Sequence, residues 1–220
     1  MNAKESQNQV QFDNYKINPT LLGPYTTHIY NNDPKHLVFL LSRYKFVAKM
    51  LEGKNKVLDI GVGDGFGLPI VSQTVNHILA IDWEPLLIDN NRKRLSHVNC
   101  EFKYVDITEN IPCDNYDAAY SLDVIEHIPL LKNDLYFKNI ASCLSSNGVF
   151  VVGTPNIAAF QYASEESKAG HVNLKSHKSL RSDLEKYYYN VFMFSMNDEI
   201  VHTGFAPMSH YIFGMGVGKR

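Results

Sequence analysis

The stretch Val57-Leu58-Asp59-Ile60-Gly61-Val62-Gly63-Asp64-Gly65-Phe66-Gly67 decides the fold of this chain. A short apolar run ends in alternate glycines, and a helical pattern follows. Alternate glycines let the backbone turn sharply and let a ligand lie directly on it. This pattern is typical of the first strand, turn and helix of a βαβ unit that binds a nucleoside.

Short apolar runs and longer helical stretches alternate on the C-terminal side of this turn. The sequence predicts parallel strands over 57–60, 77–82, 102–106, 116–123 and 149–153, and helices over 67–75, 85–95, 132–144 and 180–189. Two further runs, 191–195 and 210–214, are joined by a long loop and predict a C-terminal antiparallel hairpin. The alternation indicates a doubly wound α/β fold with a mostly parallel sheet.

A helical pattern lies on the N-terminal side of the glycine turn. From Asp33 to Gly53 apolar residues recur at helical spacing, which predicts a helix that leads into the sheet. We therefore expect residues 1–32 to form an N-terminal extension and residues 33–220 to form one domain. The segment between Pro155 and Lys175 has no clear period, and a long loop in a compact domain is often functional.

The acid in the glycine turn indicates the charge of the ligand. In the dinucleotide pattern G-x-G-x-x-G counted from Gly61, the third glycine falls at position 66, where this chain has Phe66. Asp59 would repel a diphosphate but would attract a ligand with a sulfonium and an ammonium group. A dinucleotide-dependent oxidoreductase is therefore the disfavoured alternative.

Two more acids end the next two strands. Asp82 lies about twenty residues after the turn, where a carboxylate can accept from both ribose hydroxyls, and Trp83 can cover the adenine face. Asp106 is placed to accept from the adenine amino group while Ile107 packs on the ring. The alternative for each acid alone is an ordinary turn or helix-capping aspartate.

On these residues the chain resembles the class I S-adenosylmethionine-dependent methyltransferases. The first motif corresponds to Asp59, Gly61, Gly63 and Gly65, and the following acids to Asp82 and Asp106; the fourth-strand motif contains Leu122. The resemblance implies a Rossmann-like methyltransferase fold with a seven-stranded sheet. It also implies S-adenosylmethionine as the cofactor.

The segment Asp123-Val124-Ile125-Glu126-His127 resembles the D-V-[IVL]-E-H segment of small-molecule methyltransferases, including those of the ubiquinone pathway. The resemblance implies a divalent ion such as magnesium bound by Asp123, Glu126 and His127. A metal beside the acceptor lowers the pKa of a hydroxyl. In the alternative, Asp123 caps a helix, Glu126 completes a capping box and His127 packs below the cofactor.

Methyl transfer to an alcohol requires a base near the methyl group, and histidine has a suitable pKa. The candidates are His171 in the aperiodic segment, His127, and His202 in the final hairpin loop. We expect His171 to be the base. The alternative for each loop histidine is a surface or structural role.

Composition restricts the partners. The net charge of −2 lacks the basic field of non-specific nucleic-acid binding, which favours a small-molecule substrate and no nucleic acid. Three cysteines without C-x-x-C spacing, Cys100, Cys113 and Cys143, indicate a reducing compartment, and without an apolar span we expect the cytoplasm.

The predicted function is methyl transfer from S-adenosylmethionine to a small-molecule hydroxyl, on a sugar or a related biosynthetic intermediate. The segment 164–174 and the tail 195–210 resemble methyltransferases of bacterial surface-glycan clusters, which suggests the sugar. A small-molecule N-methyltransferase and a non-catalytic donor-binding protein remain alternatives, and the oligomeric state is open.

Overall fold

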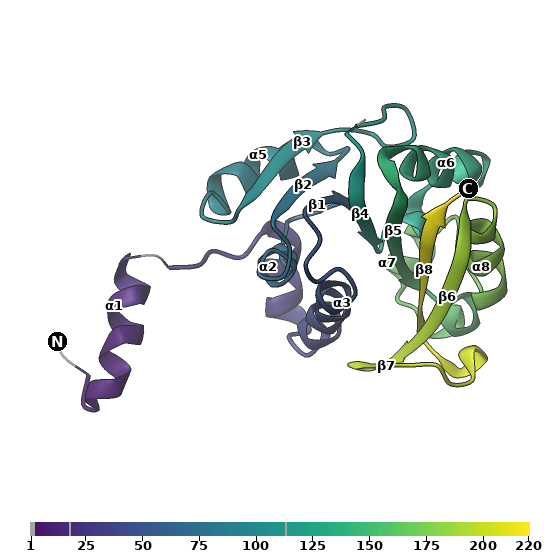
Figure 1. Ribbon diagram of the computed structural model, residues 1–220. Helices are drawn as coiled ribbons and strands as arrows, with labels where there is room; N and C mark the ends of the chain where they lie inside the picture. The colour runs from purple at the N-terminus through teal and green to yellow at the C-terminus, as the bar shows by residue number, and fades with distance from the viewer. Residues whose placement is uncertain (1–2, 18, 113) are drawn as a thin grey trace.

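The computed structural model describes residues 3–17, 19–112 and 114–220 of the chain. Cys113 lies outside these residues. The described part forms three layers, with a central β-sheet between two layers of helices (Figure 1). Within it, no helix is both long enough and apolar enough to cross a bilayer.

The sheet contains eight strands in the order β3-β2-β1-β4-β5-β8-β6-β7. Their bounds are β1 Lys56–Ile60, β2 His77–Asp82, β3 Cys100–Tyr104, β4 Tyr116–Leu122, β5 Leu144–Pro155, β6 Tyr188–Asn197, β7 Ile200–His202 and β8 Tyr211–Lys219. Strands β1 to β5 pair in parallel, whereas β8, β6 and β7 join antiparallel. The predicted fold class and hairpin are confirmed.

The eighth strand is a difference from the expected seven. The loop of the predicted hairpin folds back as β7, which pairs with the end of β6 through Ser195 and His202, Met196 and Val201, and Asn197 and Ile200. Three paired residues are too short to show a period of two, so the sequence pattern did not reveal this edge strand.

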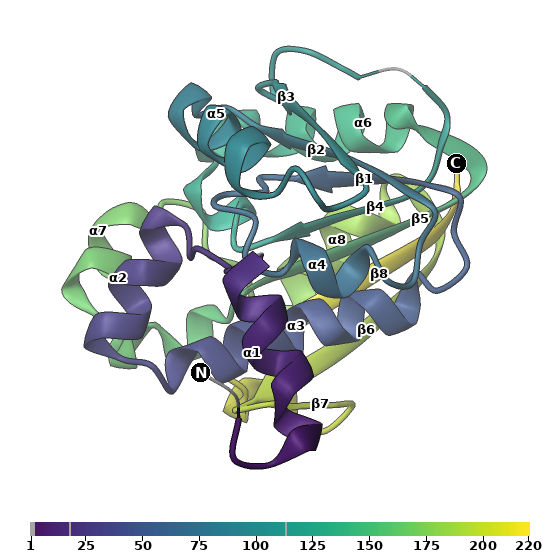
Figure 2. The same cartoon turned by 90° about the vertical axis from the view of Figure 1, so that its left-hand side faces the viewer.

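The helices are α1 Gln9–Ile17, α2 Pro24–Asn32, α3 His36–Met50, α4 Leu68–Val71, α5 Pro85–Arg94, α6 Asn133–Cys143, α7 Glu165–Gly170 and α8 His177–Glu185. Short 3-10 turns are η1 Ser6–Asn8, η2 Ile125–His127, η3 Leu130–Lys132, η4 Ile157–Tyr162 and η5 Ala206–Met208. The first helix, α1, projects from the left of the body of the molecule in Figure 1, and in Figure 2, where that side faces the viewer, it lies in front of the body.

Each face of the sheet has its own apolar core, because successive strand residues point to opposite faces. On one face Val57, from β1, packs with residues of α3, α4 and α5. On the other face Leu58 and Ile60 pack with α6 and α8. This arrangement places the carboxyl ends of β1 to β4 at one edge of the sheet, above which ligands bind in such folds.

Two predicted helices have different bounds in the structure. The helix predicted over 67–75 ends at Val71, and the hydroxyl of Thr74 then donates to the carbonyls of Ala48 and Val71, while the Thr74 carbonyl accepts from Gly53. Contacts with the end of α3 therefore replace the last helical turn. The helix predicted over 180–189 ends at Glu185, because Tyr188 pairs with Lys219 as the first residue of β6.

Candidate functional site

A cavity of about 550 Å³ lies at the carboxyl ends of β1, β2, β3 and β4. The strand order reverses between β1 and β4, which is the position where ligands bind in doubly wound sheets. Its lining includes five of the residues predicted to bind the cofactor: Gly61, Asp82, Trp83, Asp106 and Ile107. The structure thus brings the ends of three predicted strands to one cavity.

The glycine turn has the backbone conformation that the sequence predicts. Gly61, Gly63 and Gly65 all have positive φ, at 75°, 55° and 68°. A side chain at Gly61 would also collide with Val124, whose Cγ2 lies 2.3 Å from the position of an added Cβ. The turn therefore needs glycine for its conformation and for close packing against the segment after β4.

Asp59 lies beneath the turn and does not line the cavity. Its carboxylate is 3% exposed and accepts a hydrogen bond of 2.7 Å from the hydroxyl of Tyr120. Burial raises the pKa of Asp59 to about 7, although the bond from Tyr120 lowers it. Gly63, Gly65 and Leu122 also lie outside the lining of the cavity.

Asp82 and Asp106 line the cavity and also brace their own turns. The carboxylate of Asp82 accepts from the backbone N–H of Gly63 at 2.8 Å and of Glu84 at 2.9 Å. The carboxylate of Asp106 accepts from the N–H and the hydroxyl of Thr108, at 2.8 and 2.7 Å. Each aspartate thus stabilises its own turn and also lines the cavity. Trp83 is 72% exposed beside them.

A cluster of one acid and two histidines adjoins this cavity. One ligand atom from each of Glu126, His127 and His171 lies within 4.8 Å of the others. The two imidazole rings meet edge to face with centroids 5.0 Å apart. Since His127 lines the cavity, the cluster and the cavity share a side chain.

Hydrogen bonds hold this cluster together. The backbone carbonyl of Glu126 accepts from the N–H groups of Val172 and Asn173, at 2.8 and 3.0 Å, which fixes the segment that carries His171. Nδ1 of His127 lies 3.1 Å from the carbonyl oxygen of Gly170. That nitrogen must donate, so Nε2 of His127 is left as the acceptor in the neutral ring.

The pKa values of Glu126 and His171 are both shifted from their ordinary values. The Glu126 carboxyl is 1% exposed and accepts a hydrogen bond of 2.9 Å from Thr154. Burial and then the neighbouring Asp123 raise the pKa of Glu126. Burial and then His127 lower the pKa of His171. Burial therefore favours the neutral form of both Glu126 and His171.

Asp123, predicted as a metal ligand, is paired with Arg43 instead. Nη1 of Arg43 lies 2.8 Å from both carboxylate oxygens, and the guanidinium stacks over the ring of Tyr211, 3.9 Å from its centroid. Asp123 itself has a positive φ of 57°. The predicted set of Asp123, Glu126 and His127 is therefore not the group that the fold brings together.

Arg43 is a site residue that the sequence reading missed. It lies within the apolar pattern of α3 and is 7% exposed. An arginine is almost never buried unless it is paired. A charged residue inside an apolar helical stripe was therefore the available signal, although it did not reveal the partner.

His202, predicted as a candidate base, is remote from this cluster. It lies in β7, at the edge of the sheet opposite β3. Nε2 of its ring is 3.0 Å from the side-chain oxygen of Asn197, and Nδ1 accepts from the N–H of Gly204 at 3.0 Å. Both ring nitrogens are hydrogen-bonded to residues of the C-terminal hairpin, so the structure gives His202 a structural role.

The donor set of the cluster fits a divalent cation. A buried carboxylate and two imidazoles are ligands for manganese, iron or zinc, whereas magnesium prefers oxygen ligands with several waters. The expected magnesium is therefore the poorer fit among divalent ions.

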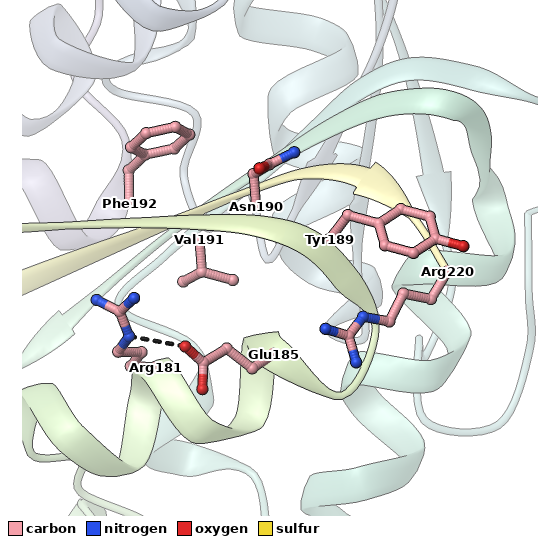
Figure 3. Close-up of a pocket in the computed structure, with 7 residues that line it drawn as sticks. All are labelled: Arg181, Glu185, Tyr189, Asn190, Val191, Phe192 and Arg220. Carbon is pink, nitrogen blue, oxygen red and sulfur yellow. Dashed lines mark hydrogen bonds and ion pairs between the residues drawn. The ribbon is translucent and has the colours of Figure 1, made fainter.

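A second cavity, of about 470 Å³, lies between α8 and β6 (Figure 3). The charge of Arg181 is balanced there by Glu185 at 2.8 Å, and Arg220 lies by Tyr189. None of the predicted site residues lines it. Of these two cavities, only the first is lined by residues that the sequence predicts for the site.

Comparison with known proteins identifies the family of this chain. Residues 34–192 match the family model described as a methyltransferase domain. A protein of Mycobacterium tuberculosis (strain H37Rv), described as a probable S-adenosylmethionine-dependent methyltransferase, is 27% identical over 105 residues, which are 47% of this chain and 37% of that protein. The ubiquinone biosynthesis O-methyltransferase of Bradyrhizobium diazoefficiens is 26% identical over 106 residues, 47% of this chain and 41% of that protein.

These matches thus span only 37% and 41% of the lengths of the two relatives. Among solved structures, the N-methyltransferase NodS from Bradyrhizobium japonicum in complex with S-adenosylhomocysteine has a TM-score of 0.62. It is 14% identical, and the match covers 86% of this chain and 90% of that one. The chain therefore belongs to the methyltransferase domain family and has the fold of the class I S-adenosylmethionine-dependent methyltransferases.

Proposed function

We propose that this chain transfers the methyl group of S-adenosylmethionine to a hydroxyl of a small molecule, such as a sugar. One observation carries the proposal: His127 belongs both to the lining of the cavity and to the cluster with Glu126 and His171. A donor in the cavity and an acceptor at the cluster would therefore meet at one side chain. The net charge of −2 supports a small acceptor and disfavours nucleic acid.

The donor would lie along the carboxyl ends of β1, β2 and β3. Gly61 would support the donor on its backbone, and Asp82 would accept from the ribose hydroxyls. Asp106 and Ile107 would bind the adenine, with Trp83 over its exposed face. Although Asp59 does not touch the cavity, its charge acts through the thin glycine turn and favours a cationic donor.

Asp82 needs no rearrangement to accept from the ribose. Its two oxygens each accept one backbone N–H, and a carboxylate has about four lone-pair sites. Sites therefore remain on both oxygens. The two existing bonds hold the carboxylate in place, which lowers the entropy cost of binding the donor.

The acceptor hydroxyl would lose its proton at the cluster. Because its pKa is lowered, His171 is neutral at pH 7 and can accept that proton. His127 can take the same role through Nε2, since its Nδ1 donates to Gly170. Methyl transfer is an in-line displacement, so the remaining task of the protein is to align the oxygen with the methyl group.

The metal proposal needs a changed set of ligands. Glu126, His127 and His171 would hold a divalent ion, and Asp123 would stay with Arg43. A bound ion would lower the pKa of an acceptor hydroxyl that coordinates it. In that case His171 serves as a ligand and not as the base, so the two roles of His171 exclude each other.

Product formation tests the function. The purified chain is incubated with S-adenosylmethionine and with panels of sugar hydroxyls, phenols and amines, and S-adenosylhomocysteine is quantified. We expect turnover with hydroxyl acceptors. Turnover with amines alone would favour an N-methyltransferase, and tight donor binding without turnover on any panel would favour a non-catalytic donor-binding protein.

A further inference from the structure

Helix α2 docks on the glycine turn, although it falls within the expected extension of residues 1–32. The carboxylate of Asp64, in the middle of the turn, accepts from the backbone N–H of Thr26 at 2.7 Å and from its hydroxyl at 3.0 Å. Thr26 is 2% exposed and Asp64 is 5% exposed, so both residues are buried. At Gly23, just before α2, an added Cβ would lie 2.4 Å from the Asp64 side chain. This close fit joins α2 to the methyltransferase domain.

Helix α5 holds the same two segments from the other side. The guanidinium of Arg94 donates to the carbonyl of Leu21 at 3.3 Å and also to the carbonyl of Asp64. The amide of Asn91 donates to the carbonyl of Gly63 at 2.7 Å. The segment before α2 and the glycine turn are therefore bound to one helix as well as to each other.

This docking places Tyr25, the neighbour of Thr26, at the cavity. Tyr25 lines the cavity together with Asp82 and Trp83, and its ring is 4.0 Å from the Cβ position of Gly63. Burial and then the carboxylates of Asp82, Glu84 and Asp64 raise the pKa of its hydroxyl, which agrees with a position among these acids. Even so, the side chain is 57% exposed. A large and partly exposed aromatic ring thus faces the cavity.

We propose that Tyr25 binds the methyl donor and that the Thr26–Asp64 hydrogen bonds position it there. This proposal rests on the proposed function, because it takes the cavity to be the donor site. The ring would cover the donor near Asp82 and remove water from it, and aromatic faces also attract a cation such as the sulfonium. Thr26 does not itself line the cavity and would act only through Tyr25.

Calorimetry with S-adenosylhomocysteine tests the proposal. We expect Tyr25→Ala to weaken binding about tenfold. Tyr30→Ala is the matched control, since Tyr30 lies in the same helix at the same 57% exposure but does not line the cavity. We expect that variant to bind within about twofold of the wild type, which is the usual scatter of a surface substitution.

The positioning role is tested by a double-mutant cycle. Thr26→Val removes one of the two bonds to Asp64 at similar volume, and we expect it to weaken binding about threefold, the effect of one modest hydrogen bond. In the Tyr25→Ala background we expect Thr26→Val to have no further effect, because the residue it positions is absent. A merely structural threonine would weaken binding equally in both backgrounds.

Three results separate the hypotheses. Binding by Tyr25→Ala within twofold of the wild type overturns the role of Tyr25. Full additivity in the cycle overturns the positioning role of Thr26. If the wild type and Tyr30→Ala both fail to bind S-adenosylhomocysteine, the proposed function itself is wrong.

Discussion

Nη1 of Arg43 lies 2.8 Å from both carboxylate oxygens of Asp123, two residues that are 80 positions apart in the sequence. The arginine is buried and stacked on Tyr211, while the aspartate side chain is 32% exposed at the cavity. Because both carboxylate oxygens of Asp123 accept a strong, charge-assisted bond from Arg43, we expect Asp123 not to join the cluster of Glu126, His127 and His171.

The ion pair predicts how the metal site responds to substitution. Arg43→Met keeps a long side chain over Tyr211 but frees the carboxylate of Asp123 to reach an ion at the cluster. We expect affinity for manganese to rise about tenfold or more, within the range that outer-shell changes produce. Titration calorimetry with Mn²⁺ measures this change.

Two further variants make that experiment decisive. Lys45→Met removes an exposed charge from the same helix, and we expect manganese affinity like that of the wild type. Asp123→Asn should have no effect alone but should cancel the gain in the Arg43→Met background. A large loss from Asp123→Asn alone would show that Asp123 is a ligand in the native protein.

The sequence predicted the parts of this site that depend on local patterns. Gly61, Asp82 and Asp106 follow directly from the ends of apolar strands, and the structure places all three at one cavity, whereas Gly63 and Gly65 lie outside its lining. The pairing of Arg43 with Asp123 and the approach of His171 to His127 depend on long-range packing, which no local period encodes. For the same reason the sequence leaves His202 among the candidate bases, because it does not show that β7 carries this residue to the far edge of the sheet.

Substitution of His171 should affect turnover and not donor binding. We expect His171→Ala to lower kcat about 100-fold, the contribution of a positioned base, with the affinity for S-adenosylhomocysteine unchanged. His97→Ala, which removes an exposed histidine, serves as the control. Equal turnover of the wild type and His171→Ala would remove this histidine from the mechanism.

Removal of metal distinguishes the base from the ligand. If Glu126, His127 and His171 hold an ion, we expect dialysis against EDTA to abolish turnover. Since the donor set contains two imidazoles, manganese or zinc should restore activity better than magnesium. Full activity in excess chelator would instead support His171 as a base that acts without metal.

The buried Asp59 predicts opposite effects of pH on stability and on donor binding. Burial raises the pKa of Asp59 from 3.8 to about 7, so folding favours its neutral form. The stabilisation from this group is complete below the unfolded pKa and is lost as pH rises through about 7. We therefore expect the Tm of the ligand-free chain to fall over this range, and Asp59→Asn to remove this part of the fall.

The cationic donor reverses the preference, because the ionised carboxylate beneath the glycine turn attracts the sulfonium. We expect the affinity for S-adenosylmethionine to rise from pH 6 to pH 8. S-adenosylhomocysteine, whose sulfur is uncharged, should show a weaker rise. Calorimetry with both ligands on the wild type and Asp59→Asn measures the difference, and Asp59→Asn should give the same pH profile for the two ligands. If the wild type also gives identical profiles, the charge of Asp59 does not select the donor.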